Sequence, residues 1–477
     1  MGTSRTPNRA LRGLLTQTGW TEDQLARRVN ALAAESGLVL RLDRRSVAHW
    51  LAGRRPRPPV PGLIAEALAR GLGHTVTLDD IGLDPRPPAP GGRGPAGGHG
   101  HTDPERRRLQ APDPATALTH LARTDDHPQG GPDDVYSLAA LTVPTFEQAT
   151  SGQPGAVPAP RTPPAPRLPA GAGPVVAAEQ MAGVFSDLDT SYGGGHSRKA
   201  LSTYLAYQVM PHLRARIGPA LRRRLLSATN QLVYLCGFMC FDNQQHALAQ
   251  RYYRVALDLA TENNDPAAYA VTLRAMSVQA RALGHYQHAL ALAETAAATS
   301  RAVAPVRQAF LYGQVAVATA ATGARADALS ALSTAERRLD QTTSRTAPGL
   351  DDTTPPGHYH AAPMGHYHPA ALAHQQAAVR ALLGDHDGAA AALTTSLRLR
   401  PPAERRSRAI TTARLAELQL QRGHLEQATR TWHSFLDDLP HLTSARATAA
   451  LNCLRSKLQP HATHVTVKAL LTRAATL

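Results

Sequence analysis

The chain has 477 residues, enough for two or three domains with separate cores. Its 51 Lys and Arg residues outnumber the 36 Asp and Glu residues, and the formal net charge of +15 favours polyanionic partners such as nucleic acid. The 3 cysteines exclude a disulfide scaffold and indicate a reducing, cytoplasmic compartment, and no apolar run approaches membrane-spanning length.

Helices are predicted within residues 1–83, the first from leucines at helical spacing beginning at Leu11. The next helix begins at Thr21, which with Gln24 forms a capping box, while Trp20 and Leu25 form a hydrophobic staple around it. A further apolar stretch predicts one more helix over residues 63–72. These residues form a small helical domain.

Between these helices, a short one is predicted to begin at Asp43 and to end before Gly53. Its buried stripe consists of Val47, Trp50 and Leu51. Because Trp50 points into the core, the opposite side of this helix is free to carry polar and basic side chains.

That opposite side and the segment after it are rich in arginine. A short helix with basic residues at its start is suited to the major groove of DNA, and arginines just past its end can meet phosphates. The predicted DNA-binding residues are Arg44, Arg45, Ser46, His49, Arg54, Arg55 and Arg57. The alternative is a solvated arginine-rich surface in a GC-biased chain, because lysine occurs only at Lys199, Lys457 and Lys468.

The order LLTQTGWTEDQLARRVN…RRSVAHWLAGRRPRP resembles the lambda-repressor-like (XRE-type) helix-turn-helix family. The resemblance implies double-stranded DNA as a partner. The chain departs from the family pattern because GLVLRL is inserted, so that about 22 residues separate the two helix starts, roughly double the usual number. Either the second helix is long or the turn is enlarged, and whether this connection still permits DNA docking is an open question.

Residues 84–174 are expected to form a disordered linker, because proline and glycine make up about a third of them. An apolar island, VYSLAALTV at residues 135–143, interrupts this composition. It is a candidate for docking on a folded part of the chain.

From residue 175 to residue 477 the chain repeats itself, mostly at intervals of 39 or 40 residues. The aligned positions are Ala249, Ala289, Ala328, Ala389 and Ala428. Small residues lie twelve positions earlier, at Gly237, Ser277, Ala316, Ala377 and Ala416. Glycines lie five positions earlier, at Gly284, Gly323, Gly384 and Gly423, and the crevice-filling residues four positions later are Tyr253, Ala293, Leu332, Leu393 and Trp432. Small residues let paired helices approach closely and the glycines end the first helix of each pair, which is the pattern of tetratricopeptide repeats.

The predicted fold is therefore all-α: a small N-terminal helix-turn-helix bundle, a disordered Pro/Gly-rich linker and a C-terminal tetratricopeptide-repeat α-solenoid. One long interval places an insertion at about residues 341–369, with HYH at residues 358–360 and 366–368. Imidazoles in such a loop could bind zinc, but histidine is frequent in this chain, so we predict no metal and no cofactor. Cys236 and Cys240 are expected to be buried small side chains.

The string YGGGHSRK, residues 192–199, suggests a phosphate cradle, but it does not match the P-loop pattern GxxxxGK[ST]. Gly195 and Ala200 fit the repeat register, so the string is predicted to be the hairpin turn of an atypical first repeat. With no catalytic triad or paired carboxylates in evidence, we expect the chain not to be an enzyme.

The first helix of each repeat is expected to line a concave groove for an extended peptide or protein. The predicted groove residues are Tyr234, Arg274, Arg281, His374 and Glu417. A groove that meets only the linker or a second subunit of a homodimer is an alternative.

The runs YGGGHSRKALSTYL and TLRAMSVQARALGHY are similar to the actinomycete negative regulators of differentiation and antibiotic production. This resemblance implies a cytoplasmic transcription regulator, a repressor of sporulation and antibiotic production. The rival hypothesis is a protein-interaction adaptor with a degenerate N-terminal module that no longer binds DNA.

Overall fold

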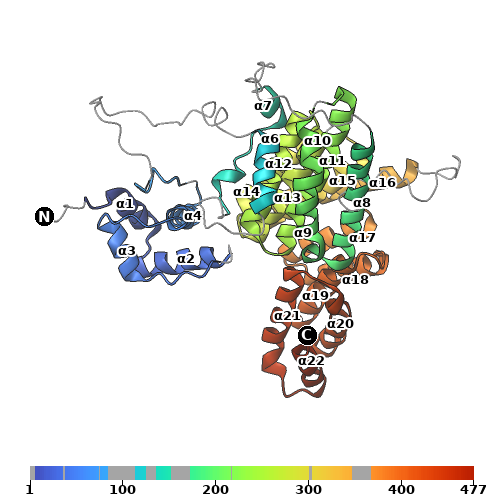
Figure 1. The fold of residues 1–477 in the computed structure, drawn as a ribbon. Helices are drawn as coiled ribbons and strands as arrows, with labels where there is room; N and C mark the ends of the chain where they lie inside the picture. Colours follow the sequence, from blue (N-terminus) through green and yellow to red (C-terminus); the bar gives the residue numbers. More distant parts are fainter. Residues whose placement is uncertain are drawn as a thin grey trace. The chain divides into compact units, whose positions relative to one another are not determined.

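The computed structural model describes residues 6–35, 38–74, 76–83, 113–124, 136–151, 172–215, 217–299, 303–345 and 367–477. All regular structure in these ranges is helical, with no strand among them, which confirms the all-α prediction (Figure 1). The chain divides into two compact units, Met1–Thr142 and Val143–Leu477. Within the described ranges, no helix combines the length and the apolar character needed to cross a membrane.

The N-terminal unit is built on four helices, α1 (Arg9–Thr18), α2 (Glu22–Glu35), α3 (Arg44–Leu51) and α4 (Val60–Leu72). Helices α1 and α2 pack on α4, and α3 packs on α2 and α1. Their apolar faces meet in a core in which Leu11, Leu25, Val29, Leu63 and Leu68 are fully buried. Burial of these side chains supplies the main driving force for this small unit.

The predicted helix signals are present. The backbone N–H of Thr21 donates to Gln24 Oε1 (2.8 Å) and that of Gln24 donates to Thr21 Oγ1 (3.2 Å), which completes the capping box. Trp50 is 5% exposed and therefore belongs to the core, as predicted. Gly53 (φ 92°) ends α3 in the left-handed region, and the N–H of Arg54 closes the last turn on the carbonyl of His49 (2.9 Å).

The segment predicted as a linker contains ordered pieces: α6 (Pro114–Thr124), the 3-10 turn η2 (Ala139–Leu141) and α7 (Phe146–Ser151). The apolar island does dock, because Tyr136 and Leu138 are buried. The N–H of Leu138 donates to Glu66 Oε2 on α4 (3.0 Å), and Arg70 lies over the ring of Tyr136 (5.9 Å). The N-terminal unit thus extends beyond residue 83, and the other residues of the predicted linker lie largely outside the described ranges.

The second unit is a succession of helical hairpins. They are α8 (Gly173–Tyr192) with α9 (Gly194–Tyr204), α11 (Pro219–Asp242) with α12 (His246–Glu262), α13 (Pro266–Ala282) with α14 (Tyr286–Thr299), α15 (Pro305–Ala321) with α16 (Arg325–Arg345), α17 (Pro369–Leu382) with α18 (His386–Leu399), α19 (Arg405–Gln421) with α20 (Leu425–Asp438), and α21 (Ala445–Leu458) with α22 (Val465–Ala475). The two helices of each hairpin pack together (Figure 1). Most neighbouring hairpins also pack against each other, for example α12 on α13 and α14 on α15. A π turn, η3 (Leu205–Val209), and α10 (Met210–Arg214) join the first hairpin to the second.

The repeat register is confirmed by burial and contact. All five aligned alanines are fully buried, and Ser277 Oγ donates to the carbonyl of Ala289 (2.6 Å), so the two small positions of one hairpin touch. The four register glycines have φ of 80–87° at the ends of α13, α15, α17 and α19. Cys236 and Cys240 are buried on α11, as expected, and are not in a disulfide.

The glycine string is the turn of the first hairpin, but Gly193 (φ 85°), not Gly195, ends α8. The string also docks on the C-terminal helices. The N–H of Gly195 donates to the carbonyl of Thr443 (2.8 Å), and the N–H of Thr443 donates to the carbonyl of Tyr192 (2.7 Å). Because α8 packs on both α11 and α19, the first hairpin joins the early hairpins to the late ones.

The insertion begins later than predicted, because α16 continues to Arg345. Of its histidines, His358, His360 and His366 lie outside the described residues. His368 accepts from the N–H of Ala370 at the start of α17 (3.3 Å), and its Nε2 lies 2.6 Å from Glu404 Oε1. Among the described residues, no group of three or more His, Cys, Asp and Glu side chains is arranged to hold a metal.

Candidate functional site

Helix α3 presents Arg44, Arg45 and His49 to solvent on the side opposite Trp50. Ser46 is half-buried and has a local task, because its hydroxyl donates to Asp43 Oδ1 (2.8 Å) and its backbone N–H donates to the same oxygen (2.9 Å). The bond from the Ser46 N–H and the return bond from the Asp43 N–H to Ser46 Oγ (3.4 Å) form a capping box at the start of α3. The hydrogen bonds from Ser46 lower the pKa of Asp43, so its carboxylate is ionised. It lies at the edge of the surface formed by Arg44, Arg45 and His49, which we call the basic face.

Arg44 is held loosely by the neighbouring helix. Its Nε lies 3.3 Å from Glu22 Oε2 on α2, and the arginine side chain is 79% exposed. An ion pair this exposed contributes little to stability, so the guanidinium can exchange the carboxylate for another acceptor at small cost.

The connection from α2 to α3 spans residues 36–43, longer than the turn of about 3–4 residues in an ordinary helix-turn-helix. The second helix is long and the turn is enlarged, so both alternatives raised by the sequence apply: α2 has 14 residues. The end of the connection is fixed by Asn30, whose side chain donates to the carbonyl of Leu42 (2.8 Å) and accepts from its N–H (3.0 Å). At the other end of α3, the N–H of Asn8 donates to the carbonyl of Leu51 (2.9 Å). Helix α3 is thus positioned at both ends despite the enlarged connection.

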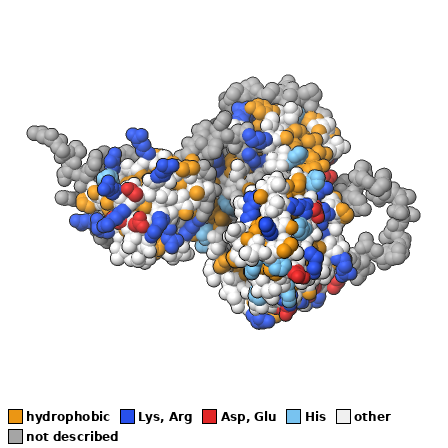
Figure 2. All heavy atoms as spheres, turned by 90° about the horizontal axis from the view of Figure 1, so that it is seen from below, with side chains coloured by type: hydrophobic (Ala, Val, Ile, Leu, Met, Phe, Trp, Pro, Cys, Tyr) orange, Lys and Arg blue, Asp and Glu red, His pale blue; other side chains and the backbone are white. Residues whose placement is uncertain are grey.

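Arg54, Arg55 and Arg57 are exposed immediately after α3. Figure 2 views the N-terminal unit from below, the side on which α2 and α3 lie in Figure 1, and shows basic side chains, all arginine in this unit, gathered there with few acidic ones. Sequence reasoning did not single out Arg28 of α2, which is exposed and stacks over the ring of Trp20 (4.2 Å). The pair of arginines in ARRVN of the second helix was the available signal.

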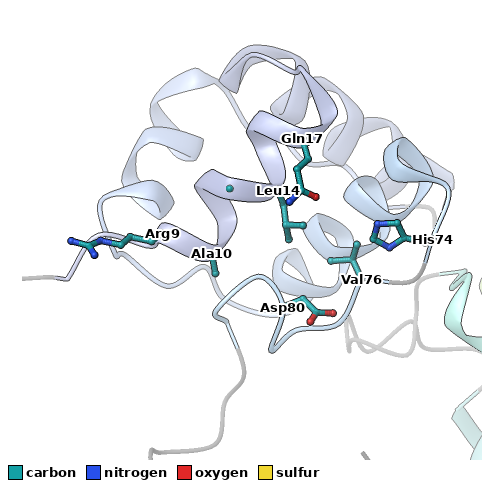
Figure 3. A pocket seen from close by; sticks show the side chains of 8 residues that line it. Arg9, Ala10, Leu14, Gln17, His74, Val76 and Asp80 are labelled. Atoms are coloured by element: carbon teal, nitrogen blue, oxygen red, sulfur yellow. The ribbon is translucent and has the colours of Figure 1, made fainter. Parts of the chain in front are cut away.

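A hollow of about 480 Å³ lies on the N-terminal unit, between α1 and the segment after α4 (Figure 3). Its lining mixes the apolar Leu14 and Val76 with the polar Arg9, His74 and Asp80. It includes none of the predicted DNA-binding residues, so it is separate from the basic face.

In the second compact unit, Val143–Leu477, which we call the repeat unit, the predicted groove residues differ in burial and in their partners. Tyr234 is 4% exposed, so its ring is part of the packing and not a free contact surface. The carboxylate of Glu417 forms an ion pair with the ammonium group of Lys457 (3.5 Å). Arg274 lies with its guanidinium 3.7 Å from the centre of the Phe310 ring, and Arg281 is half-buried on the same helix, α13.

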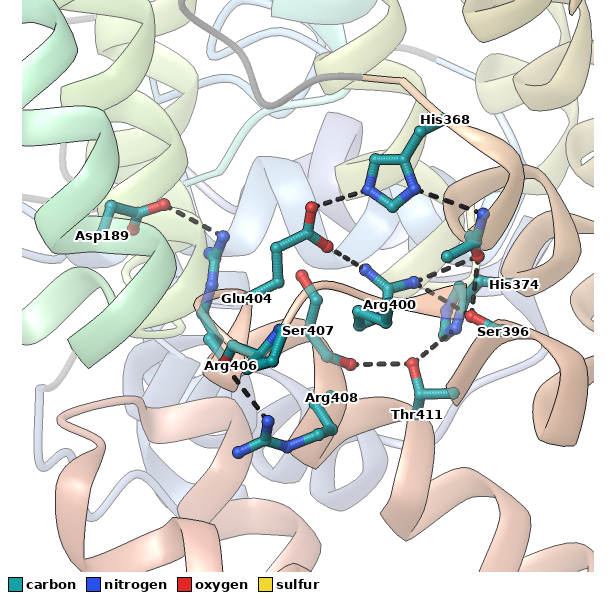
Figure 4. Close-up of polar contacts among 12 residues, drawn as sticks. Asp189, His368, His374, Ser396, Arg400, Glu404, Arg406, Ser407, Arg408 and Thr411 are labelled. Carbon is teal, nitrogen blue, oxygen red and sulfur yellow. Dashed lines mark hydrogen bonds and ion pairs between the residues drawn. The ribbon is translucent and has the colours of Figure 1, made fainter. Parts of the chain in front are cut away.

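His374 on α17 lies within a polar network on α17, α18 and α19 (Figure 4). Its Nδ1 is 3.0 Å from Thr411 Oγ1. Burial, together with the positive charges of Arg414 and Arg400, lowers the pKa of His374 to about 3. The imidazole is therefore neutral at physiological pH. Glu404 bridges Arg400 (2.5 Å) and His368 (2.6 Å) in the same network.

A buried ion cluster that the sequence did not reveal joins the first hairpin to the later ones. Arg406 of α19 pairs with Asp189 of α8 (3.0 Å), and Arg446 of α21 lies 3.5 Å from Asp242 at the end of α11. The N–H of Gly194 donates to Asp242 Oδ2 (3.0 Å), so this carboxylate also caps α9. Burial raises the pKa of Asp189 to about 6 despite the charge of Arg406.

Residues 11–84 match the family model of the SP15 N-terminal domain. This range contains most of α1, all of α2, α3 and α4, and every predicted DNA-binding residue, and the repeat unit lies outside it. No curated protein matches the chain.

Proposed function

We propose that this chain is a DNA-binding transcription regulator of development and secondary metabolism whose repeat unit receives a peptide or protein signal. The observation that carries the proposal is the arrangement around α3, where a buried Trp50 directs Arg44, Arg45 and His49 outward. The resemblance to the lambda-repressor-like helix-turn-helix family supports it. We infer further that the protein is cytoplasmic, that it is not an enzyme, and that the resemblance to negative regulators makes it a repressor.

In this function α3 enters the major groove. Arg45 in its first turn reaches a base edge, where an arginine bidentate to guanine is worth about 1–3 kcal/mol of discrimination. Arg54, Arg55 and Arg57 follow the helix and contact phosphates, which hold the register without reading sequence. The capping role of Ser46 keeps the first turn of α3 in place and leaves its hydroxyl less available for bases.

The hairpins from α11 to α22 would act as a tetratricopeptide-repeat solenoid, with their first helices facing the partner. The aligned small residues and the glycines at the ends of α13, α15, α17 and α19 support this interpretation. A homodimer would place two copies of α3 on successive half-sites, as in other helix-turn-helix regulators.

The second candidate is a protein-interaction adaptor whose N-terminal unit does not bind DNA. Two observations favour it: Arg44 is paired with Glu22 of α2, and the α2–α3 connection is enlarged. An adaptor would retain the same repeat unit and partner.

Selection of bound sequences from random duplex DNA, followed by salt titration, separates the two candidates. Arg45→Ala should relax sequence preference, whereas Arg54→Ala with Arg55→Ala should weaken all sequences alike and remove about one unit of salt slope per arginine. Arg398→Ala, an exposed arginine on α18, is the matched control and should bind as the wild type does. If no DNA is retained selectively, or if both arginine sets leave binding unchanged, the adaptor takes the place of the regulator.

A further inference from the structure

The repeat unit contains arginines that no carboxylate neutralises. Among the described residues, no ion pair is made by Arg274 or Arg281 of α13 or by Arg414 of α19. The nearby carboxylates form ion pairs with other arginines: Asp189 pairs with Arg406, Asp242 with Arg446, and Glu404 with Arg400. This region therefore carries a surplus of positive charge.

Two of these guanidinium groups are also short of hydrogen-bond acceptors. The Nε atoms of Arg274 and Arg281 are buried and have no hydrogen-bond partner among the described residues. A buried donor without an acceptor costs free energy that a ligand oxygen could recover. Arg414 is exposed and open to an incoming group.

Arg281 is repelled by both Arg414 and Arg274, although α13 and α19 belong to different hairpins. Burial, together with the charges of Arg414, Arg446 and Arg274, lowers the pKa of Arg281 to about 10. Burial and the charges of Arg414 and Arg400 hold His374 neutral, so the imidazole adds no charge to the site. Such an arrangement is unfavourable in the unliganded protein and becomes favourable when an anion binds.

The spacing indicates what kind of anion. Arg274 and Arg281 lie on one helix, and seven residues at 1.5 Å each separate them by about 10 Å along its axis. One phosphate or carboxylate cannot span that distance. In an extended polyproline-II peptide, residues three apart share one face and are about 9 Å apart.

We propose that Arg281 with Arg414, and Arg274 stacked on Phe310, bind two carboxylate side chains of an acidic peptide that stand three positions apart. The inference rests on the proposed function, because it names the chemistry of the partner that the repeat unit receives. The ring of Phe310 lies 5.3 Å from the ring of Tyr367, and the two offer an apolar surface beside the carboxylate that binds Arg274.

Fluorescence anisotropy with the full chain tests this site. The probe is a labelled, capped peptide containing Glu-Ala-Ala-Glu, and the comparison peptide contains Glu-Glu-Ala-Ala, which has the same charge at the wrong spacing. The correctly spaced peptide should bind more tightly, and Arg281→Gln with Arg414→Gln should weaken it about tenfold or more, as for the loss of a charge-assisted contact. The matched control, Arg398→Gln with Arg430→Gln, removes two exposed arginines from α18 and α20 and should leave affinity unchanged.

The unliganded variants give a second readout. Removing the Arg281 charge relieves repulsion, so Arg281→Gln should raise the thermal midpoint of the free protein, whereas an arginine that holds the fold together would lower it on substitution. Equal loss of peptide binding in both double variants, equal binding of the two peptides, or full competition by inorganic pyrophosphate overturns the proposal. DNA retention by the same proteins reports separately on the N-terminal unit, so a failed peptide site and a failed DNA-binding proposal are distinguishable.

Discussion

The docking of the first hairpin on α11 can be tested with Gly194→Ala. A Cβ atom at Gly194 would lie 2.6 Å from the carbonyl oxygen and 2.7 Å from the Cα of Met239. Both contacts are with backbone, so no side chain can rotate away and α9 must shift from α11. Overpacking of this kind costs about 1–3 kcal/mol.

The shift would also disturb the bond from the Gly194 N–H to the buried carboxylate of Asp242 (3.0 Å). A hydrogen bond to a charged group contributes about 1.5–3 kcal/mol, so partial loss brings the expected destabilisation to about 2–4 kcal/mol. Urea unfolding of the full chain, followed by far-UV circular dichroism, measures this change. Hydrogen exchange should also become faster at the amides of Gly195 and Thr443, which bond the same glycine string to the segment before α21.

Gly183→Ala is the matched control. Gly183 lies within α8, and a Cβ atom added there would have no heavy atom within 4 Å, so alanine should stabilise the helix by about 0.5–1 kcal/mol. If Gly194→Ala proves as stable as Gly183→Ala, the first hairpin does not depend on this close approach, and the docking argument fails.

Trp50→Ala should destabilise the N-terminal unit by about 3–5 kcal/mol and abolish DNA retention while the repeats keep their helicity; an N-terminal unit that stays protected from proteolysis would contradict the burial of this ring. Asn30→Ala removes both bonds to Leu42 and should cost about 1–3 kcal/mol in urea unfolding, with DNA affinity falling although no proposed contact residue has changed; unchanged stability would show that the connection is held by other contacts. Because the folded pKa of Asp189 is raised from 3.8 to about 6, the protonated form favours folding, so this contribution is fully present below about pH 4 and is lost as pH rises through 6. It is on the order of 3 kcal/mol, and Asp189→Asn should flatten the dependence of stability on pH across that window; an identical pH profile in the variant would assign the titration to another group.

The sequence determined the features that depend on neighbouring residues and on periodicity. The capping box at Thr21, the helix start at Asp43, the inward position of Trp50 and the hairpin register could all be read in advance, because helix signals act over three or four residues and each repeat packs like the next. The glycines that end α13, α15, α17 and α19 followed from the same register.

Tertiary structure alone decided the contacts between hairpins far apart in the chain. The pairing of Asp189 with Arg406, the docking of the glycine string on Thr443 and the approach of Arg281 to Arg414 join residues from distant hairpins. A repeating pattern specifies how each hairpin packs on its neighbour, but these contacts depend on the small rotation at each step, which accumulates over the whole stack. The sequence predicted Arg274 and Arg281 as binding residues, and only the folded stack brought Arg414 within electrostatic reach of Arg281 and left these charges without a carboxylate among the described residues.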